Sequence, residues 1–463
     1  MDSFSLKSCF IFCPSLLPSK KKPSDEEIQD AKLLIYYPSS EETLIKRSNI
    51  GIIEGTIDFI QSFNKDSEQN KKVNNKLFFT ELNFTYFISY KFEKDIYIVL
   101  LLVKSNLGFK HFESMDLEKK WLRYLIKNFY KIFYLFHGDI YSNFFPDGKD
   151  IREDKIKYQN LTVKFSDFIS SYFEYFTNMQ TPFLDCVLYL ECNKDNAYTS
   201  IVSSILRLNE KVPQIEKICV VYKGRIVHNE IDIDIMSLIY NMFYYSENGE
   251  EKTEQFREPL IIEGIDDLFS PFRKAFLTLE NGYLLGAKKG PVFIPTIYIK
   301  KNKMKFKLCV YKHNNFCFFF FLNNDYNYID DTSFFYNTAS FIQKFFDKDI
   351  LAKPTQNFLT KYANCDNINF VYYNEDNHCL LFSKFFYEKN TNIIDKTKID
   401  VIQMIYEIIT KTNRSSVTKI KNYYIYYMTT FEKRIAILLK DYRTIEEVRE
   451  EYLQKVYTII DYL

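Results

Sequence analysis

Glycine and tryptophan are scarce in this chain, whose 463 residues include 11 glycines and one tryptophan. A surplus of one charge is also lacking, because 61 basic residues stand against 60 acidic ones and leave a formal net charge of +1. Without an overall field, contact with a nucleic acid or an anionic membrane has to come from a local basic patch. We expect no nucleic-acid partner.

The common motifs of metal and nucleotide sites are missing as well. The nine cysteines form no CxxC pair and the histidines do not lie near cysteine pairs, so we expect free thiols in a reducing compartment and no metal site. The patterns GxxxxGK(S/T), GxGxxG and GxSxG are absent, which argues against nucleotide binding or hydrolysis by this chain. These absences predict no cofactor, and a regulatory binding protein rather than an enzyme.

Long hydrophobic runs are lacking too. The longest are Ile96–Val103 and Phe316–Leu322, far short of the ~20 residues that a membrane span needs. The N-terminus makes a poor signal peptide. We therefore expect a cytoplasmic protein whose association with membranes is peripheral.

The most informative stretch runs from Ala31 to Phe63. The apolar run Lys32–Tyr37 predicts a strand buried on both faces, and Pro38 ends it because proline has no N–H for a ladder. The next residues, from Ser39 to Glu42, predict the start of a helix, since the hydroxyls can cap its free N–H groups.

The helix that follows carries two apolar sets at helical spacing. They comprise Ile45, Ile52, Phe59 and Phe63 on one side, and Ile50, Ile53, Ile57 and Ile60 on the other. One sheet contact needs only one stripe, so the helix is either fully buried or packs on its sheet and on a second subunit. Gly51 and Gly55 indicate a close backbone approach, because glycine inside a helix costs about 1 kcal/mol relative to alanine.

Four segments of the first part resemble the CCZ (calcium–caffeine–zinc sensitivity) vacuolar fusion proteins in order and spacing. They are SCFIFCPSL (Ser8–Leu16), KLLIYYP (Lys32–Pro38), KRSNIGIIEGTIDF (Lys46–Phe59) and YLFHGDI (Tyr134–Ile140). The resemblance is strong over residues 1–142 and mostly topological beyond them. The same layout also occurs in the related Hermansky–Pudlak-type subunits.

The resemblance implies an α+β fold of three longin-like domains, each an antiparallel sheet flanked by helices. It also implies a function. CCZ proteins pair with a MON (monensin sensitivity) longin subunit, and the heterodimer is the guanine nucleotide exchange factor that activates the GTPase Rab-seven on late endosomes, lysosomes or vacuoles. Two alternatives stay open: a Hermansky–Pudlak-type subunit that activates another Rab, and a non-catalytic longin scaffold of a tethering or coat complex.

The resemblance places the contacts with the partner and the GTPase on the first strand–helix unit. The residues concerned are Tyr36, Tyr37, Asn49, Gly51, Ile52, Gly55 and Phe59. The reading that several of them only fill the core stays open beside this one.

The predicted order of strands and helices repeats along the chain, although the letters do not. The first part has predicted strands at Lys7–Phe12, Lys32–Tyr37, Lys76–Leu82, Thr85–Phe92 and Asp95–Lys104 and a helix from about Asp116 to Phe136. Later predictions include a strand at Phe183–Glu191, helices at Asp232–Tyr245 and Phe334–Tyr362, a strand at Lys433–Lys440, and helices at Lys396–Lys411 and Thr444–Tyr462. We predict a first longin domain over residues 1–144, a linker and bridging helix over 145–182, a second longin domain over 183–363 and a third over 364–463.

Four local predictions accompany this division. They are a polar loop through Lys20 to Lys22, a polar linker over 145–163 before a helix at Val163–Met179, a hairpin turn at Asn281-Gly282, and one strand over Lys419–Thr429.

Five lysines form the clearest basic cluster. They are Lys300, Lys301, Lys303, Lys305 and Lys307. The cluster is either a solvated edge that discourages aggregation or a patch for anionic or phosphoinositide headgroups, where each lysine contributes about 1 kcal/mol near the surface.

The other chemical candidates have structural explanations. His137 is expected at the surface at the end of a helix, where the helix dipole favours it, with Gly138 as the C-cap. His378 and Cys379 are adjacent and so point to opposite faces of a strand, which argues against a catalytic pair. The acidic residues from Glu230 to Asp234 fit a helix N-terminus, and those from Glu263 to Asp267 fit a loop.

Overall fold

The structure is a computed structural model, and it describes part of the chain. The described residues are 4–18, 20–65, 77–82, 85–93, 95–104, 115–178, 196–222, 225–244, 281–284, 292, 294–300, 304–313, 316–327, 333–346, 369–374, 379–382, 416–420, 423–430, 433–440 and 450. The chain divides into two compact units. The first comprises Met1–Gln180, Asp266–Arg273 and Ile297–Met304, and the second comprises Thr181–Ile265, Lys274–Thr296 and Lys305–Leu463.

The first unit is built on an antiparallel sheet of order β2-β1-β5-β4-β3. Its strands are β1 (Phe4–Phe12), β2 (Leu33–Tyr37), β3 (Leu77–Leu82), β4 (Thr85–Glu93) and β5 (Ile96–Lys104). Residues 96–102 of β5 are buried without a break, because this central strand is covered on both faces. The five strands lie where the sequence predicts them, within one to three residues at each end.

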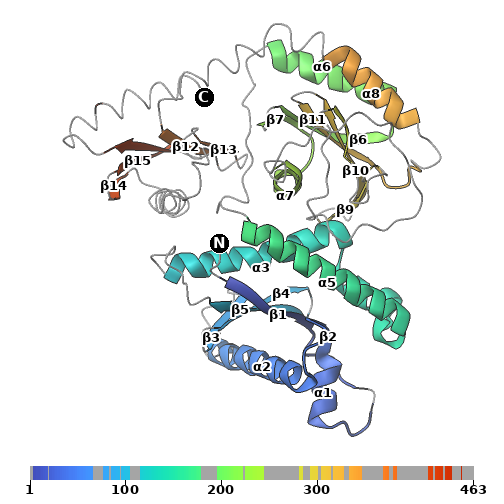
Figure 1. The fold of residues 1–463 in the computed structure, drawn as a ribbon, viewed down its shortest axis with the longest axis vertical. Coiled ribbons are helices and arrows are strands. Elements are labelled where there is room, and N and C mark those ends of the chain that lie inside the picture. Colours follow the sequence, from blue (N-terminus) through green and yellow to red (C-terminus); the bar gives the residue numbers. More distant parts are fainter. Residues whose placement is uncertain are drawn as a thin grey trace. The chain divides into compact units, whose positions relative to one another are not determined.

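Helices cover both faces of this sheet (Figure 1). They are α1 (Asp25–Lys32), α2 (Thr43–Lys65), α3 (Met115–His137), α4 (Ile140–Phe144) and α5 (Lys155–Asn178), with short 3-10 turns η1 (Pro146–Gly148) and η2 (Ile151–Glu153). On one face, α2 packs into a cluster with side chains of β1, β2, β3, β4 and β5. On the other face lie α3 and α5, whose aromatic rings pack edge to face.

The sequence analysis missed two features of this unit. Lys20 to Lys22 lie in a loop as predicted, but helix α1, which follows them, was not predicted. Its start is fixed by a capping box: Ser24 Oγ accepts from Glu27 N–H, and the Glu27 carboxylate accepts from Ser24 N–H. The segment 145–163, expected as a linker, contains η1, η2 and the first nine residues of α5. The C-cap prediction is confirmed, because Gly138 has φ +74° and its N–H donates to Tyr134 O.

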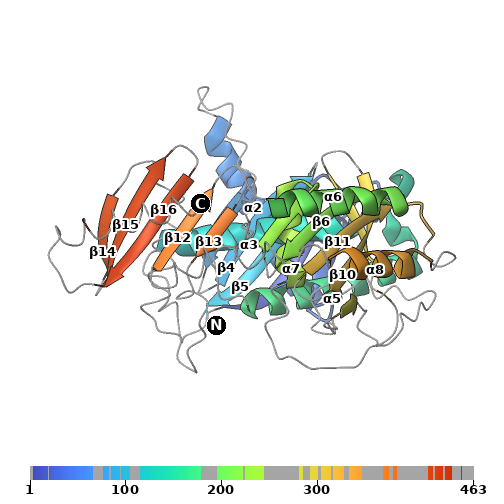
Figure 2. The same cartoon turned by 90° about the horizontal axis from the view of Figure 1, so that it is seen from above.

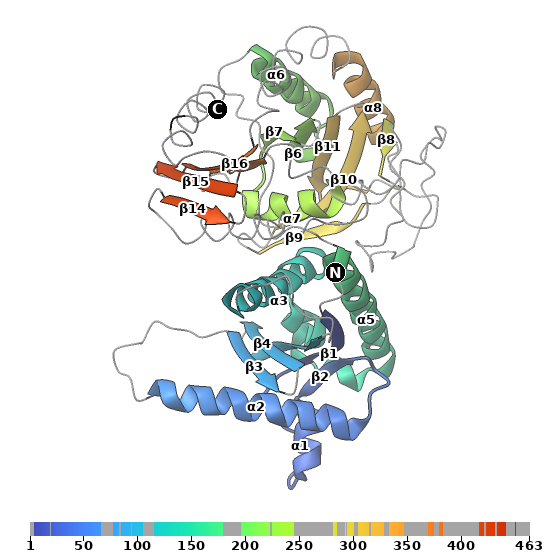
Figure 3. The ribbon, with the colours of Figure 1, turned by 60° about the vertical axis from the view of Figure 1, so that its left-hand side comes forward.

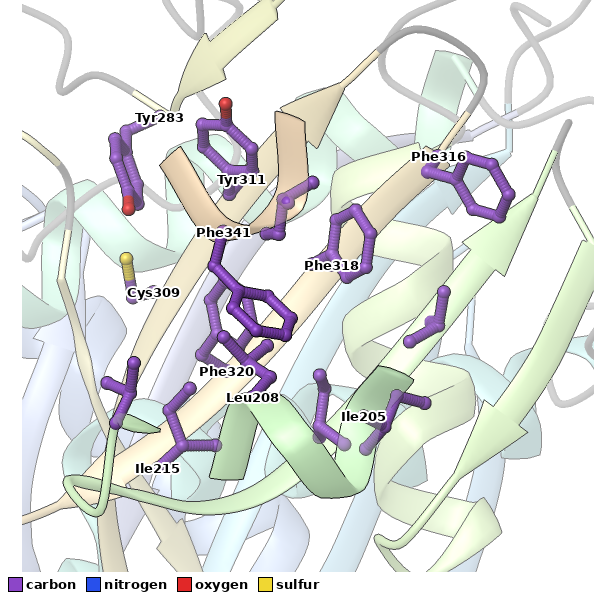
Figure 4. Close-up of a cluster of buried hydrophobic side chains, with 14 of the residues drawn as sticks. Ile205, Leu208, Ile215, Tyr283, Cys309, Tyr311, Phe316, Phe318, Phe320 and Phe341 are labelled. Carbon is purple, nitrogen blue, oxygen red and sulfur yellow. The ribbon is translucent and has the colours of Figure 1, made fainter. Parts of the chain in front are cut away.

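The second unit contains a sheet with the strand path β7-β6-β11-β10-β8. Its strands are β6 (Ile215–Tyr222), β7 (Arg225–Asn229), β8 (Asn281–Tyr283), β10 (Met304–His313) and β11 (Phe316–Asn323). A further short strand, β9 (Thr296–Ile299), lies between β8 and β10 in the sequence, and its last three residues belong to the first unit. The helices are α6 (Asn196–Lys211), α7 (Ile233–Tyr244) and α8 (Ser333–Phe346). Figure 4 shows the core on one face, where Phe318 and Phe320 of β11 meet Leu208 of α6 and Phe341 of α8.

A third sheet follows, with order β13-β12-β16-β15-β14 (Figure 2). Its strands are β12 (Asn369–Asn374), β13 (Cys379–Phe382), β14 (Ser416–Ile420), β15 (Tyr423–Thr430) and β16 (Lys433–Lys440). When the strands on each path are numbered in sequence order, with β9 of the six-stranded second sheet left out, all three paths read 2-1-5-4-3. The repeated antiparallel architecture predicted from the sequence pattern is therefore present in the described strands, and the fold is α+β.

The turn and strand predictions fail at two places. Asn281 and Gly282 lie inside β8, paired with His313 and Lys312 of β10, and form no hairpin turn. The single strand expected over Lys419–Thr429 is two strands, β14 and β15, which pair with each other. The strand predicted at 183–191, the helix at 396–411, the end of the helix predicted to reach 362, and the acidic group 263–267 lie outside the described residues. Of the helix predicted at 444–462, only residue 450 is described, and it is helical.

Candidate partner-binding face

Helix α2 has an inner face that belongs to the core of the first unit. Ile50, Ile53 and Ile57 are at most 4% exposed and pack with Phe10 and Val99 of the sheet. Their spacing of three and four residues places them on one stripe. The second apolar set predicted from the sequence is therefore the core-facing one.

The opposite face of α2 carries large apolar side chains that are exposed to solvent in the described structure. Leu44 is 75% exposed, Phe59 is 63% exposed, and Ile45 and Ile52 are each 36% exposed. Ser48 and Gly55, both exposed, lie between them on the helical wheel. We call Leu44, Ile45, Ser48, Ile52, Gly55 and Phe59 the outer stripe of α2. A soluble surface rarely gathers large apolar residues in one row unless the row binds something.

The two glycines of α2 have different surroundings. A Cβ on Gly51 would lie 3.5 Å from Gln29 Nε2, so Gly51 faces α1 of the same chain. A Cβ on Gly55 would meet no atom within 4 Å. Neither glycine therefore shows the close backbone approach that the sequence led us to expect: Gly51 is in ordinary contact distance of a side chain of α1, and the space beside Gly55 is open.

Ion pairs hold α1 against one flank of α2 (Figure 3). Arg47 donates to both carboxylate oxygens of Asp30, at 2.9 and 2.7 Å, and also pairs with Glu26. Lys32 pairs with Glu54. The hydrogen bonds from Arg47 hold the pKa of Asp30 below its ordinary value. Because α1 has no buried residue, these charges carry much of its attachment.

Two of the predicted interface residues lie inside the core. Tyr36 is 4% exposed and stacks on Phe10 with ring centroids 5.3 Å apart, and Asn49 is 7% exposed. Asn49 Nδ2 donates to Tyr36 Oη over 2.7 Å, which satisfies both polar groups in a buried place. In this conformation neither side chain reaches a partner, so their place is structural. Tyr37, at the end of β2, is half-buried and its hydroxyl hydrogen bonds with Ser170 Oγ of α5 at 2.9 Å.

The lysine cluster is divided by its contacts. Lys300 Nζ donates to Tyr130 Oη at 2.8 Å and lies over the Tyr130 and Tyr134 rings. Lys307 donates to Tyr326 O at 2.6 Å, and burial lowers its pKa. Lys305 is exposed, while Lys301 and Lys303 lie outside the described residues. Intramolecular contacts thus occupy two of the five expected lipid-facing charges.

A polar cluster that the sequence did not reveal lies where β4, α3 and α4 meet. Glu93 accepts from Tyr130 Oη at 2.7 Å and from the N–H groups of Tyr141 at 2.8 Å and Ile140 at 3.2 Å. Burial raises the pKa of Glu93 to about 7, and the hydrogen bond with Asp139 adds to the shift. The sequence did contain one indication of this cluster. Asp139 directly follows the C-cap Gly138, and an aspartate in that place can start a new helix, as it does here as the N-cap of α4. The arrangement caps a short helix and contains no nucleophile.

His137 departs from its expected surface position. Its ring packs on Phe133 and Phe168, with centroids 4.8 and 5.7 Å away. Burial lowers its pKa to about 4, and the charge of Lys164 contributes. His137 is therefore a partly buried residue whose ring is neutral at neutral pH. Asp232, in contrast, lies as expected at a helix start, where its carboxylate accepts from Asp234 N–H at the beginning of α7.

Other chemistry was sought among the residues that the structure describes. None of their His, Cys, Asp and Glu side chains form a group of three or more that could hold a metal ion. None of the helices in the described part is both long and apolar enough to cross a membrane. Five cysteines described there carry free thiols, four of them buried.

The comparison with known families concerns this same part of the chain. Residues 6–138 match the model of the first longin domain of INTU, CCZ1 and HPS4. The match covers β1 to α3, which includes α2 and its outer stripe. The first unit therefore contains a longin domain of this group, and the match does not distinguish among its three named members. No curated protein matches the sequence.

Proposed function

We propose that the chain is a longin subunit of a heterodimeric guanine nucleotide exchange factor that activates a Rab GTPase in vesicle traffic. The observation that carries this proposal is the outer stripe of α2, a row of solvent-exposed apolar side chains inside a longin domain of the INTU, CCZ1 and HPS4 group. The resemblance of residues 1–142 to CCZ proteins favours a MON-family longin subunit as partner and Rab-seven as GTPase.

The stripe suits a helix of a second longin domain better than it suits a small molecule. Apolar side chains at 44, 45, 52 and 59 run along one side of α2 for fifteen positions, which is about 22 Å at 1.5 Å per residue. Gly55 and Ser48 leave room between the larger side chains for a partner's side chains or backbone. A partner helix laid along this row would bury apolar surface over its whole length.

Exchange by such a complex is binding and requires no bond chemistry. A platform that binds the nucleotide-free GTPase more tightly than the GDP-bound form shifts the GTPase toward release, because only differential affinity moves such an equilibrium. Ile52 and Phe59 are the partner-facing or GTPase-facing candidates that the structure leaves exposed. We propose peripheral membrane association on the late endosome, lysosome or vacuole, with Lys305 as the exposed charge toward anionic or phosphoinositide lipids.

The test is the release of fluorescent GDP from Rab-seven, measured with the chain alone and with a MON-type partner. We expect acceleration only with the partner, because the platform is made by both subunits. A correctly assembled heterodimer that does not accelerate release would contradict exchange activity toward Rab-seven. The same assay with other Rabs then distinguishes a Hermansky–Pudlak-type subunit from a scaffold without exchange activity.

Gly55 offers a matched pair of variants. Gly55→Ala and Gly55→Leu both favour the helix by up to about 1 kcal/mol, and no atom lies within 4 Å of the added Cβ. Only the leucine fills the open place in the outer stripe. We expect Gly55→Leu to weaken heterodimer formation at least tenfold while Gly55→Ala changes it little. Equal binding by both variants would place the partner elsewhere.

A further inference from the structure

A segment that follows the matched longin domain only much later in the sequence belongs to the first unit. Residues 297–304 are part of that unit, although the family match ends at residue 138. Lys300 Nζ donates to Tyr130 Oη of α3 at 2.8 Å, across 170 positions of sequence. The same ammonium lies 4.9 Å from the centre of the Tyr130 ring and 5.4 Å from that of Tyr134. A hydrogen bond and two cation–π contacts therefore attach this segment to α3.

Tyr298 provides a second attachment. Its ring lies so close to Gly138, just past α3, that a Cβ added to the glycine would be 3.1 Å from Tyr298 Cδ1. The glycine thus leaves room for the ring. We call residues 298–300 the docked segment, because Tyr298 and Lys300 both contact the end of α3.

The hydroxyl of Tyr130 links the docked segment to a buried carboxyl group. Tyr130 Oη donates to Glu93 Oε1 at 2.7 Å while it accepts from Lys300. A hydrogen bond to an ionised carboxylate is stronger than one to a neutral carboxyl, and hydrogen bonds in a chain polarise one another. The contact with Lys300 should therefore be stronger when Glu93 carries its charge.

Glu93 and Asp139 are two carboxyl groups in one place. Burial raises the pKa of Glu93 to about 7, and the hydrogen bond with Asp139 adds to the shift. Two carboxyl groups in such contact retain a proton between them, because the doubly ionised pair repels itself. The N–H groups of Ile140 and Tyr141 also bond to Glu93. As backbone donors they can hold its carboxyl group in place whether or not it is ionised.

Several other titratable or charged groups of the described part lie around Glu93. They are Tyr130 and Tyr134 on α3, Asp139 at the start of α4, Lys300 in the docked segment, and Lys91 and Asp95 on the β4–β5 hairpin. Lys91 and Asp95 pair with each other at 2.6 Å. Burial raises the pKa of both tyrosines above its ordinary value, so neither ionises near pH 7. The cation that the Glu93 carboxylate meets through Tyr130 is Lys300.

We propose that the Glu93–Asp139 pair makes the docked segment proton-sensitive: loss of the shared proton strengthens the hold of α3 on Lys300, and its return weakens that hold. The new negative charge lies one hydroxyl group away from the ammonium, in a place where burial strengthens the attraction. Ionising a buried carboxyl group still costs free energy, and the contact with Lys300 offsets part of this cost. This inference concerns contacts within the chain and does not depend on the proposed function.

The test is hydrogen exchange of residues 296–300 in the full chain at pH 6 and pH 8, with the rates corrected for the intrinsic effect of pH on exchange. In the parent, protection should be about threefold higher at pH 8, since the gain is that of a partly exposed ion pair. In Glu93→Gln, protection should equal that of the parent at pH 6 and should not change with pH. Lys300→Gln should remove the pH dependence as well.

Lys131→Gln is the matched control, because Lys131 is exposed and is adjacent to Tyr130 in α3. It removes the same charge from the same part of the protein and should keep the pH dependence of the parent. Protection of 296–300 that does not change with pH in the parent would overturn the proposal. So would a pH dependence that is the same in Lys300→Gln as in Lys131→Gln, and Lys300→Gln keeps this test available if Glu93→Gln does not fold.

Discussion

Helices α2 and α7 hold the same place in two sheets of identical strand order, since each follows the first two strands. They differ in their outer faces. In α7 the five consecutive residues 236–240 are all at most 7% exposed. In α2 the outer stripe is open along the helix. An apolar helix that its own chain covers on every side is a core element, whereas one with an uncovered face is a candidate for binding.

The comparison shows why the family match alone does not locate a binding face. Both helices are apolar enough to be read as buried, and their sequences carry no chemical motif. Only the exposure of Leu44, Ile52 and Phe59 separates the two cases. Introducing a charged residue into each helix is therefore the most direct test of whether their outer faces differ in burial.

The largest effect is expected from Ile239→Glu in α7, compared with Ile52→Glu in α2. Ile239 is 0% exposed, and an unpaired buried carboxylate costs on the order of 4 kcal/mol or more. Ile52→Glu should change the free energy of unfolding by less than about 1 kcal/mol, because its side chain reaches water, and should abolish partner binding. Denaturant unfolding and partner pull-down measure the two effects. Similar destabilisation by both variants would show that the two helices are equally buried.

A smaller effect is expected from the two faces of α2 itself. Ile53→Ala removes a side chain that is 2% exposed and should cost about 2–4 kcal/mol, through lost burial and the cavity left behind. Ile45→Ala, on the outer stripe, should cost less than about 1 kcal/mol in the isolated chain and more in the complex. Thermal unfolding with and without the partner measures this difference, and an equal loss in both states would argue against binding at Ile45.

The stability of the two units should depend on pH in opposite directions through two glutamates, Glu93 and Glu230. Glu93 in the first unit has a folded pKa of about 7, above its ordinary value, because of burial. Its contribution to stability is full below the unfolded pKa and is lost as pH rises through about 7. Burial also raises the pKa of Glu230 in the second unit, but hydrogen bonds from His228 and Ile218 N–H outweigh it and leave the pKa lowered. The contribution of Glu230 to stability is present above the pKa of the unfolded chain, and it is lost as the pH falls through the lowered pKa of the folded state.

Glu93→Gln tests this sign directly. The variant should unfold at a higher temperature than the parent at pH 8 and at nearly the same temperature at pH 4.5, measured by hydrogen exchange or calorimetry of the first unit. Glu230→Gln should unfold at a lower temperature than the parent at pH 7 and at nearly the same temperature at pH 3. If the difference in unfolding temperature between variant and parent changed with pH in the same direction for both variants, Glu93 would not have the raised pKa on which this prediction depends.

The smallest effect is expected where α1 meets α2. Arg47→Gln removes the donors to Asp30 and Glu26, so hydrogen exchange in residues 25–32 should speed up while exchange in the sheet does not. High salt should produce the same change in the parent, since exposed ion pairs are screened. Lys20→Gln, which affects only a pair with Glu27, is the control. Unchanged exchange of α1 in Arg47→Gln would mean that apolar contacts hold it.

Much of the fold was readable from the sequence because strands and amphipathic helices leave periodic patterns. The strands Thr85–Phe92 and Lys433–Lys440 and the helix Asp232–Tyr245 were predicted within one residue of β4, β16 and α7. Helix α1 was missed because its face is polar, although Ser24 and Glu27 carried the capping signal. The hairpin turn at Asn281-Gly282 was predicted wrongly. This dipeptide is common in tight turns, but here its pairing with β10 holds it in a strand.

The sequence by itself determined the repeated strand order, the two apolar sets of α2 and the longin character of residues 6–138, because these depend on local periodicity and motif spacing. The tertiary structure decided which set faces water, that Tyr36 and Asn49 are core residues, and that Tyr37 hydrogen bonds with Ser170 of α5. Burial depends on contacts between separate elements, and the hydrogen bond of Tyr37 joins residues 133 positions apart. No local pattern encodes either.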